Sequence, residues 1–512
     1  MSEPSVFTGT VLGIFGNAAA ATAQATTIPL YLYFLGTRGY AVIAFATTVL
    51  ATARVFDLGI STCVVRGLAG IRASESRRSA IVLMNTFEAL SISIAIIAAT
   101  LTIIITHFSG ALDYLTLFFS EVQCTAIAFP IVILSHATTA FLTNYYIHCL
   151  LGLNLHRTIA VLRFSESASL IMATLIAFCF FNADTTTILC LNASVSTILC
   201  ILTRSTLAKH TGGMSYRFEV DTTLVKDHIR FAIGVTWVNI LAIAMVHADR
   251  FVLLRYLKVT EYGQYCIANA SVAAAYGLVV PAFANALMTR FSSHKTCNNQ
   301  TIAREYRFAM QSVSVFAAIA YMSCELLAST FLAYLLKGNG SVSSVTVTAK
   351  LIASGYSINA IMVPVHYLLL SRGHSRVPAN ISTILASIFL PSLVFMSSLF
   401  GQIGAAANFF MMNMTYFLIG IFAAHRIELT SLKTTIFRQD IFPPFAGALT
   451  FAIFSNSIMF FMDLNPASTA LSRLATAAVL IAMMFYAMPD LRYNLTTMAN
   501  TIARKRIGDR SG

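Results

Sequence analysis

The chain has 512 residues, of which 57% are hydrophobic and only 10% are charged, and its formal net charge is +13. Soluble domains usually carry about 25% charged residues, so this chain has too few charged side chains to cover a soluble surface of its size. Lipid must therefore contact most of that surface. The basic residues occur in short clusters between apolar runs, a pattern that favours a membrane protein and not a nucleic-acid partner.

Apolar runs long enough to cross the hydrocarbon as helices, about 20 residues each, follow one another along nearly the whole chain. They do not show the alternation over about 10 residues that barrel strands show. The sequence therefore predicts an all-α, polytopic membrane protein with about fourteen spanning helices. The predicted spans are residues 8–35, 40–66, 79–106, 122–149, 156–181, 184–203, 229–254, 262–290, 306–336, 345–371, 378–400, 402–425, 440–462 and 467–490.

Most of the 33 Lys and Arg residues fall in alternate connections between these spans, among them 204–230 and the tail after residue 490. Basic connections stay on the cytoplasmic side, so we expect both termini to be cytoplasmic. The connections on the other side are short, and the longest covers about 107–121. No folded domain is expected outside the membrane.

Motifs of cofactor and metal sites are missing from the sequence. The nine cysteines are scattered, mostly inside apolar runs, and no CxxC spacing occurs. The sequence also has no P-loop, zinc-ligand spacing or nucleophile elbow. We therefore predict no catalytic residue, no cofactor and no metal, and a carrier in place of an enzyme.

Ionisable residues inside spans indicate where the chemistry lies, since each costs at least about 2.5–3.5 kcal/mol at a helix centre unless it is paired or hydrated. Arg54 and Asp57 are three residues apart in the second span and could pair on one helical face. Arg163 and Glu166 repeat this spacing in the fifth span. Such pairs could lock helices together. In a hydrated cavity, the guanidinium groups could instead bind a phosphate with two parallel hydrogen bonds.

Further ionisable residues extend the set of candidates. The candidates for substrate binding are Arg54, Asp57, Arg163, Glu166 and Arg250. The candidates for coupling or gating are Glu88, His136, His247, Asp249, Arg66 and Arg290. His136 could carry a coupling proton or be a hydrogen-bonded structural histidine. Glu325 is expected to stand alone in the ninth span.

A weak internal repeat is also present. Gly39-Tyr40 begins the second span and Arg66 ends it, as Gly263-Gln264-Tyr265 begins the eighth span and Arg290 ends it. Duplication of a six-helix unit about an axis along the membrane normal would produce this spacing.

The run RVFDLGISTCVVRGLA at 54–69 resembles the lipid-linked oligosaccharide flippases of O-antigen and capsule synthesis, the polysaccharide transport branch of the MOP superfamily. Those proteins typically have an aspartate-leucine-glycine turn in the second helix, followed by an arginine; here these residues are Asp57-Leu58-Gly59 and Arg66. The stretch from Ala248 to Tyr265 is similar to their seventh-to-eighth helix junction, and GQIGAA at 401–406 to their eleventh-to-twelfth turn.

The resemblance implies two six-helix lobes, residues 1–210 and 211–427, around a basic cavity, with two further helices and a basic tail in 428–512. It also implies that the chain moves oligosaccharides on undecaprenyl pyrophosphate from the cytoplasmic to the periplasmic leaflet of a bacterial inner membrane, by alternating access. The implied partners are the lipid-linked oligosaccharide, membrane lipids, and a polysaccharide polymerase with its chain-length machinery. Arg54 and Arg163 each have an acid three residues on, which makes the cavity less basic than the resemblance implies.

Three alternatives remain open. A multidrug or ion-coupled exporter of the same superfamily would carry mostly cationic drugs, which fits only if both intramembrane arginines are neutralised. A membrane-embedded polysaccharide polymerase or ligase would need a large periplasmic loop, which the sequence lacks. A structural scaffold would need no cavity at all.

Overall fold

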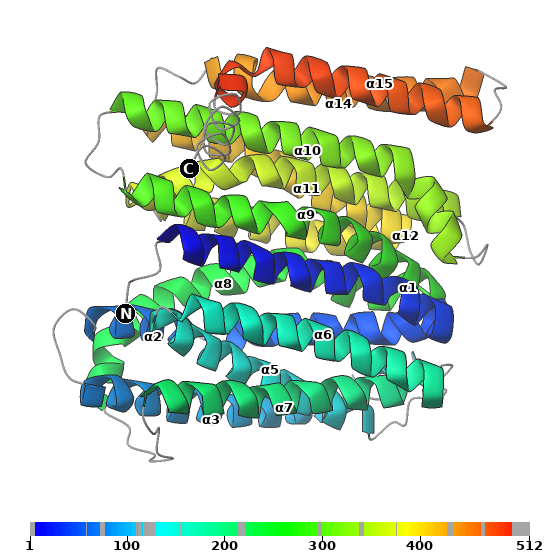
Figure 1. The fold of residues 1–512 in the computed structure, drawn as a ribbon. Coiled ribbons are helices and arrows are strands. Elements are labelled where there is room, and N and C mark those ends of the chain that lie inside the picture. Colours follow the sequence, from blue (N-terminus) through cyan, green and yellow to red (C-terminus); the bar gives the residue numbers. More distant parts are fainter. Residues whose placement is uncertain are drawn as a thin grey trace, which may run out of the picture. The chain divides into compact units, whose positions relative to one another are not determined.

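The computed structural model of the chain is built from helices (Figure 1). It describes residues 6–57, 59–71, 77–108, 110, 114–115, 118, 128–153, 155–181, 183–211, 222–293, 299–336, 342–374, 376–427, 435–461 and 466–493. Every regular element in these residues is a helix, as the sequence predicts. The chain is therefore an all-α, polytopic membrane protein.

Within the described residues, the first part of the chain contains eight α-helices and one short 3₁₀ turn. In order they are α1 (Val6–Ala53), η1 (Arg54–Asp57), α2 (Ile60–Ile71), α3 (Arg77–Phe108), α5 (Ala128–Gly152), α6 (His156–Phe181), α7 (Thr185–Thr211), α8 (Thr222–Tyr256) and α9 (Val259–Ser293). The second part contains α10 (Asn299–Leu336), α11 (Val342–Ser371), α12 (Arg376–Ile427), the π-helical turn η4 (Ile436–Ile441), α14 (Phe442–Phe461) and α15 (Pro466–Ala487).

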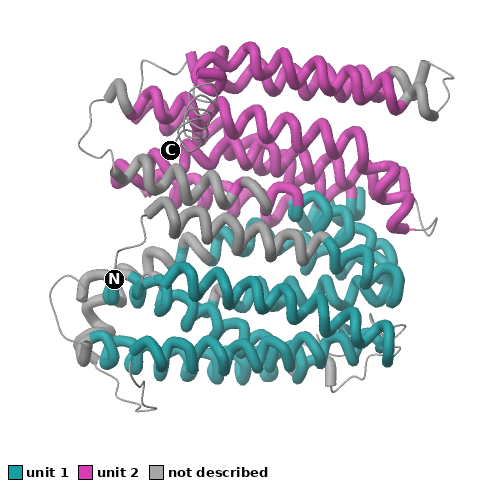
Figure 2. Tube along the Cα trace, viewed as in Figure 1, with its two compact units in different colours: residues 1–274, 393–402 teal, residues 275–392, 403–512 magenta. Residues whose placement is uncertain are grey.

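Two compact units make up the chain (Figure 2). Unit 1 contains residues 1–274 and 393–402, and unit 2 contains residues 275–392 and 403–512. Helix α9 and helix α12 each contribute to both units. The predicted lobes, residues 1–210 and 211–427, with 428–512 outside them, are defined by their role in transport and not by compactness. This division stays a prediction.

Where the structure describes them, the predicted spans are helical; α12 contains two predicted spans, and α1 contains the first span and the beginning of the second. Helix α1 is interrupted at Gly36, which has φ 67°, and α12 at Gly401, which has φ 54°. Glycine adopts such positive φ values without the steric strain of other residues, so a single residue ends one span and begins the next. Within the described residues, eight helices are long and apolar enough to cross a membrane by length and composition.

The second predicted span is not one continuous helix. Its first half is the end of α1, which passes into η1, and its second half is α2. Between them Gly59 has φ 73°. The helix that was expected to hold Arg54 and Asp57 on one face is therefore broken at these residues.

The core of unit 1 joins α2, α3, α5 and α7. Val64, Met84, Tyr145, Leu150 and Leu207 are buried in it. The Tyr145 hydroxyl donates to the Met84 carbonyl (2.6 Å), so its one polar atom is satisfied within the apolar contact. This cluster fixes α3 against α5.

Unit 2 contains two apolar clusters on α10. One, which includes Met310 and Val365, joins α10 to α11, α12 and η4. The other, which includes Met322 and Phe451, joins α10 to α14 and α15. Charge pairs also join α10 to η4 and to α11: Arg307 contacts Asp440 of η4 at 3.1 Å, and Lys350 of α11 contacts Glu325 at 2.5 Å.

The expectation that Glu325 stands alone is wrong. Its carboxylate accepts from Lys350 and from Asn456 (3.1 Å), and its carbonyl accepts from Arg473 (3.0 Å). In the sequence, Lys350 and Arg473 stand near the ends of predicted spans, so they do not count as intramembrane partners for Glu325. Their helices, α11 and α15, pack on α10 and bring these cations to Glu325.

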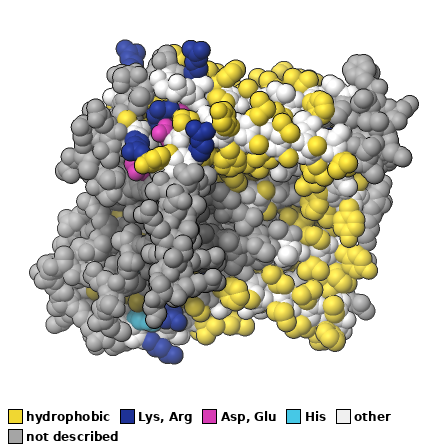
Figure 3. All heavy atoms as spheres, turned by 45° about the horizontal axis from the view of Figure 1, so that its top comes forward, with side chains coloured by type: hydrophobic (Ala, Val, Ile, Leu, Met, Phe, Trp, Pro, Cys, Tyr) yellow, Lys and Arg dark blue, Asp and Glu magenta, His cyan; other side chains and the backbone are white. Residues whose placement is uncertain are grey.

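Large apolar side chains face outward from these helices. Phe180 is 79% exposed, Tyr334 77% and Leu471 70%. Figure 3 shows hydrophobic side chains over much of the described surface on one face of the molecule, with Lys and Arg in small groups. Such a surface is stable only in contact with lipid.

Candidate functional site

Three elements of unit 1 bring together a group of buried and half-buried polar side chains. We call this group the Arg250 cluster; it consists of Thr48 on α1, His247, Asp249 and Arg250 on α8, and Tyr265 and Asn269 on α9. Three of its members, His247, Asp249 and Arg250, are predicted site residues, and the fold confirms that they lie together.

The guanidinium group of Arg250 binds neutral side chains. Its Nη1 atom donates to Thr48 Oγ1 (3.1 Å) and to His247 Nδ1 (3.4 Å), and its Nη2 atom donates to Asn269 Oδ1 (3.2 Å). Thr48 itself donates to the Ala44 carbonyl at 2.8 Å, which leaves its oxygen lone pairs for Arg250. The cation thus lies among hydrogen-bond acceptors that carry no charge.

The Asp249 carboxylate is buried and is held by other partners. The Tyr265 hydroxyl and the Asn269 amide (3.5 Å) donate to its Oδ2, and the Arg250 backbone N–H donates to its Oδ1 (2.8 Å). Asn269 therefore bridges the two charges, since its oxygen accepts from Arg250 and its nitrogen donates to Asp249. Buried charges normally need such partners, because an unpaired one is strongly destabilising.

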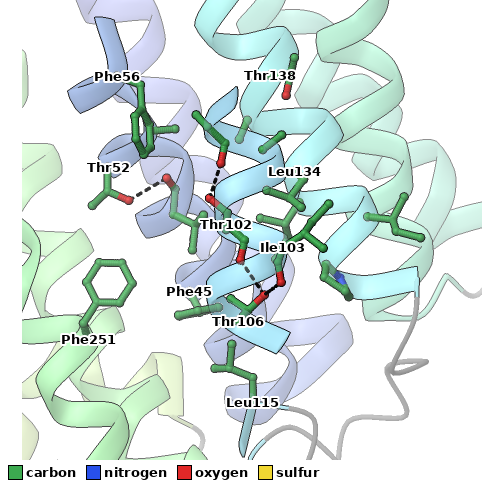
Figure 4. A pocket seen from close by; sticks show the side chains of 18 of the residues that line it. Phe45, Thr52, Phe56, Thr102, Ile103, Thr106, Leu115, Leu134, Thr138 and Phe251 are labelled. Carbon is green, nitrogen blue, oxygen red and sulfur yellow. Dashed lines mark hydrogen bonds between the residues drawn. The ribbon is translucent and has the colours of Figure 1, made fainter. Parts of the chain in front are cut away.

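A cavity of about 830 Å³ lies beside the cluster, within unit 1. Its walls come from α1, η1, α3, α5 and α8, together with Tyr114 and Leu115 (Figure 4). On α8, Phe251 follows Arg250 directly and Leu254 stands four residues after it, and on α1 Phe45 and Val49 flank Thr48. The polar cluster and the apolar cavity therefore share two helices.

The Asp57 carboxylate lies at the start of α2. It is buried, and its oxygens accept from the Ser61 hydroxyl (2.5 Å) and the Ser61 backbone N–H (3.3 Å). Asn144 on α5 in turn donates to the Ser61 hydroxyl at 3.5 Å. A carboxylate at a helix N-terminus satisfies free N–H groups and complements the helix dipole. Asp57 thus has a capping role that the sequence did not predict, and its predicted pairing with Arg54 stays a prediction.

Glu88 has a strong partner that the sequence did not predict. Its Oε1 atom accepts from Arg204 Nε on α7 (2.7 Å) and from the Tyr146 hydroxyl on α5 (2.8 Å). Arg204 had been assigned to a connection because the predicted span ended at residue 203, but α7 continues to Thr211. The three residues join α3, α5 and α7, and a gating role for Glu88 stays a prediction.

The other predicted residues lie elsewhere in unit 1 or outside the described side chains. Arg163 and Glu166 are half-buried on α6, which packs on α1, α5 and α7, and His136 is half-buried on α5. The side chains of Arg54, Arg66 and Arg290 lie outside the described part of the chain.

Thr48 and Tyr265 are members of the cluster that sequence reasoning missed. One signal could have found Tyr265: it stands four residues before Asn269, and residues four apart share a helix face. Thr48 carries no such signal, because nothing in its local sequence distinguishes it from the other threonines of α1.

The sequence and the fold of the chain are similar to those of known proteins. The sequence model of a family described as "Polysaccharide biosynthesis protein" matches residues 6–295. No curated protein sequence matches the chain.

Solved structures share the fold at low sequence identity. The structure of a lipid II flippase, MurJ, in an inward closed conformation has TM-score 0.62 and 13% identity, and the match covers 93% of this chain and 96% of that one. An inward-facing multidrug resistance transporter of the MATE family, in the MOP superfamily, has TM-score 0.57 and 13% identity, with 82% and 95% covered. A eukaryotic MATE transporter has TM-score 0.58 and 13% identity, with 81% and 93% covered.

Proposed function

We propose that this chain, which belongs to the polysaccharide biosynthesis protein family, moves oligosaccharides linked to undecaprenyl pyrophosphate across a bacterial inner membrane. Its family supports a role in polysaccharide assembly, and the fold that it shares with a lipid II flippase and with MATE transporters supports transport by alternating access. The cargo enters from the cytoplasmic leaflet and leaves from the periplasmic one.

One observation carries this proposal: the Arg250 guanidinium lies among spanning helices, and its Nη atoms donate to Thr48, His247 and Asn269, uncharged acceptors that an anion can replace. A hydrogen bond between neutral groups contributes about 0.5–1.5 kcal/mol, and one to a charged group about 1.5–3 kcal/mol. A pyrophosphate oxygen can therefore replace Thr48 or Asn269 as the acceptor with a net gain. The planar guanidinium then binds two phosphate oxygens at once.

The test compares three variants in cells that depend on this chain for surface polysaccharide. Arg250→Ala should strongly reduce export while lipid-linked oligosaccharide accumulates inside, because the phosphate contact is lost. Arg250→Lys should restore part of the export, since an ammonium group keeps the charge but not the planar fork. Lys258→Ala is the matched control: it removes an exposed cation of the same segment, and export should stay at the wild-type level. Normal export by Arg250→Ala at normal protein amounts would refute the proposal.

The orientation is part of the proposal and has its own test. Both termini should be cytoplasmic, because most basic residues of the sequence fall in connections on that side. Reporter fusions after Arg510 should be active only in the cytoplasm, and fusions in the connection at 107–121 only in the periplasm. A periplasmic carboxyl terminus would require an odd number of spans.

An exporter of hydrophobic drugs is the second candidate function, favoured by the size and apolar lining of the cavity and by the shared fold with MATE transporters. Cavities of about 300–1,000 Å³ suit drug-sized ligands. Against it, a cationic drug would be repelled by Arg250. The test is to express the wild type and the Arg250→Ala variant in a drug-sensitive strain and to measure drug resistance. Equal resistance from both proteins would favour the exporter.

A further inference from the structure

The wall of the unit 1 cavity is more apolar than its composition suggests. Three of its threonines, Thr52, Thr102 and Thr106, donate their hydroxyl protons to backbone carbonyls of their own helices at 2.7–2.8 Å. Figure 4 shows these bonds beside the cavity. Because a hydroxyl that is already bonded to its own helix donates no proton to a ligand, the threonines offer mainly methyl groups. Hydrocarbon fits such a wall, whereas sugar hydroxyls would lose their hydrogen bonds with water there.

Exposed apolar side chains line the cavity and continue beyond it along α3. Two of its lining residues, Ile103 on α3 and Ile131 on α5, are 55% and 61% exposed. On α3 the neighbouring Ile96 and Ile97 are also exposed. A hydrocarbon chain can therefore pass from the bilayer into the cavity without crossing a polar region.

Cationic groups stand at the side of the cavity that α8 forms. Arg255 is itself a lining residue, and Arg250 immediately precedes Phe251, another lining residue. Their separation along α8 is five residues, about 7.5 Å at 1.5 Å per residue. This arrangement is complementary to an amphiphile in which a phosphate is joined directly to a long apolar chain.

We propose that the cavity binds the polyisoprenyl chain of the cargo, in the segment next to the pyrophosphate. This inference rests on the proposed function and adds a second contact to it: Arg250 holds the phosphate and the cavity holds the adjoining isoprene units. Unit 1 then recognises both the phosphate and the lipid part of the cargo. Acyl chains of ordinary phospholipids enter the cavity with lower affinity, because they bring no pyrophosphate to Arg250.

A photoreactive side chain inside the cavity tests the identity of the occupant. Phe251 is replaced by p-benzoylphenylalanine, an aromatic residue of related shape, in the full chain in native membranes. Phe164 on α6, which is 61% exposed on a lipid-facing helix, receives the same replacement as the control. After irradiation, polyisoprenyl phosphates should be enriched over phospholipids at Phe251 relative to Phe164 by roughly tenfold, equivalent to about 1.4 kcal/mol. Equal ratios of the two lipids at both sites would overturn the proposal.

Filling the cavity tests whether occupancy matters for transport. Ala98→Phe on α3 and Thr138→Phe on α5 both add bulk to the wall. Ile97→Phe is the matched control, since Ile97 is 57% exposed and adjoins Ala98 in the chain. At equal protein amounts, both filling variants should reduce polyisoprenyl crosslinking at Phe251 and polysaccharide export by roughly tenfold, and the control should change neither. Two separate walls are used so that misfolding of one variant does not leave the question open.

The outcomes separate this inference from the proposed function. If Arg250→Ala stops export but both filling variants export normally and the Phe251 probe captures phospholipid, the cavity is not a polyisoprenyl site and the proposed function stands. If the probe captures polyisoprenyl phosphate while deletion of the chain leaves polysaccharide export intact, the binding site stands and the proposed function fails.

Discussion

Arg307 of unit 2 and Arg250 of unit 1 both lie among spanning helices, but their guanidinium groups have different partners; Arg204 of unit 1 resembles Arg307, because it pairs with Glu88. In unit 2, Arg307 binds Asp440 through two hydrogen bonds of 3.1 Å, and Lys350 binds Glu325 at 2.5 Å. In unit 1, the guanidinium of Arg250 donates to Thr48, His247 and Asn269, which carry no negative charge. Arg307 thus contacts a carboxylate directly, whereas the hydrogen bonds described for Arg250 go to uncharged side chains, one of which, Asn269, links it to Asp249.

The unit 2 network also connects more of the chain. Gln311 on α10 donates to Asp440 (2.7 Å) and to Asp490 (3.1 Å), and it accepts from the Leu491 backbone N–H (2.9 Å). Through these bonds α10 is fixed to η4 and to the residues that follow α15. Charge pairs of this kind hold helices together. Charges held by neutral groups remain able to bind an anion, and this difference separates a scaffold from a candidate site.

The largest effect on stability is expected in unit 2. Asp440→Ala removes the buried carboxylate that binds the half-buried Arg307, which keeps a longer contact to Asp490 at 3.5 Å. The cost should therefore approach, at most, that of breaking a fully buried pair on one side, about 3–5 kcal/mol. Protein amount in the membrane and thermal stability in detergent should both fall sharply. The double variant Arg307→Leu with Asp440→Leu should recover much of both, because no uncompensated charge remains. Failure of the double variant to recover would mean that Gln311 and its bonds matter more than the charge pair.

The next effect concerns Arg54, whose side chain lies outside the described part of the chain and whose contact with the cargo phosphate stays a prediction. Arg54→Ala should abolish polysaccharide export while the protein is still made and inserted, a loss of about 3 kcal/mol or ~100-fold for a two-fold phosphate contact. Arg54→Lys should recover only part of the export. Export and protein amount are measured in the same cells. A parallel fall in both would place Arg54 with the structural pairs of unit 2.

A smaller effect is expected when unit 1 is made to resemble unit 2. Thr48→Asp places a carboxylate where Arg250 now finds a neutral hydroxyl, and the cargo phosphate must then displace a charged acceptor. Export should fall by roughly tenfold, which corresponds to about 1.4 kcal/mol. Thr48→Val, which removes the acceptor without adding charge, should cause a smaller fall. If the two variants reduce export equally, the charge of the acceptor beside Arg250 does not determine export.

The smallest effect is expected at Asp57. Its bonds to Ser61 cap α2, and asparagine is an equally good cap. Asp57→Asn should therefore change the stability of the protein by less than about 1 kcal/mol and leave its amount in the membrane near that of the wild type. Asp57→Leu should cost about 0.5–2 kcal/mol. If Asp57 instead neutralises Arg54, Asp57→Asn would lower the protein amount as strongly as Asp57→Leu, because both remove the charge.

The sequence predicts the helices well because their apolar runs must be continuous to cross lipid. The predicted span 156–181 has the same bounds as α6, and the predicted ends at residues 400 and 402 flank the break at Gly401. Hydropathy is less informative about polar residues at helix ends. For this reason α7 was predicted to end before Arg204, although its helix includes that residue.

The site is only partly predictable, because the partners of a side chain depend on how helices pack. The group of His247, Asp249 and Arg250 is visible in sequence, since all three stand within four residues on α8. Thr48 joins them only because α1 packs on α8, and Lys350 joins Glu325 only because α11 packs on α10. The predicted Arg54–Asp57 pair assumed a continuous helix, which the turn at 54–59 interrupts.

The break at Gly36 has a consequence for how the chain is made. Only residues 36–39 separate the predicted spans 8–35 and 40–66, so hardly any connecting segment is available to be carried through the membrane after the first helix has settled. We expect the two helices to leave the ribosome-bound translocation channel together, as a preformed hairpin, with the orientation of the first helix decided only when the second has been synthesised. An early ribosomal stall before the second helix emerges would then leave the N-terminal segment without a fixed orientation.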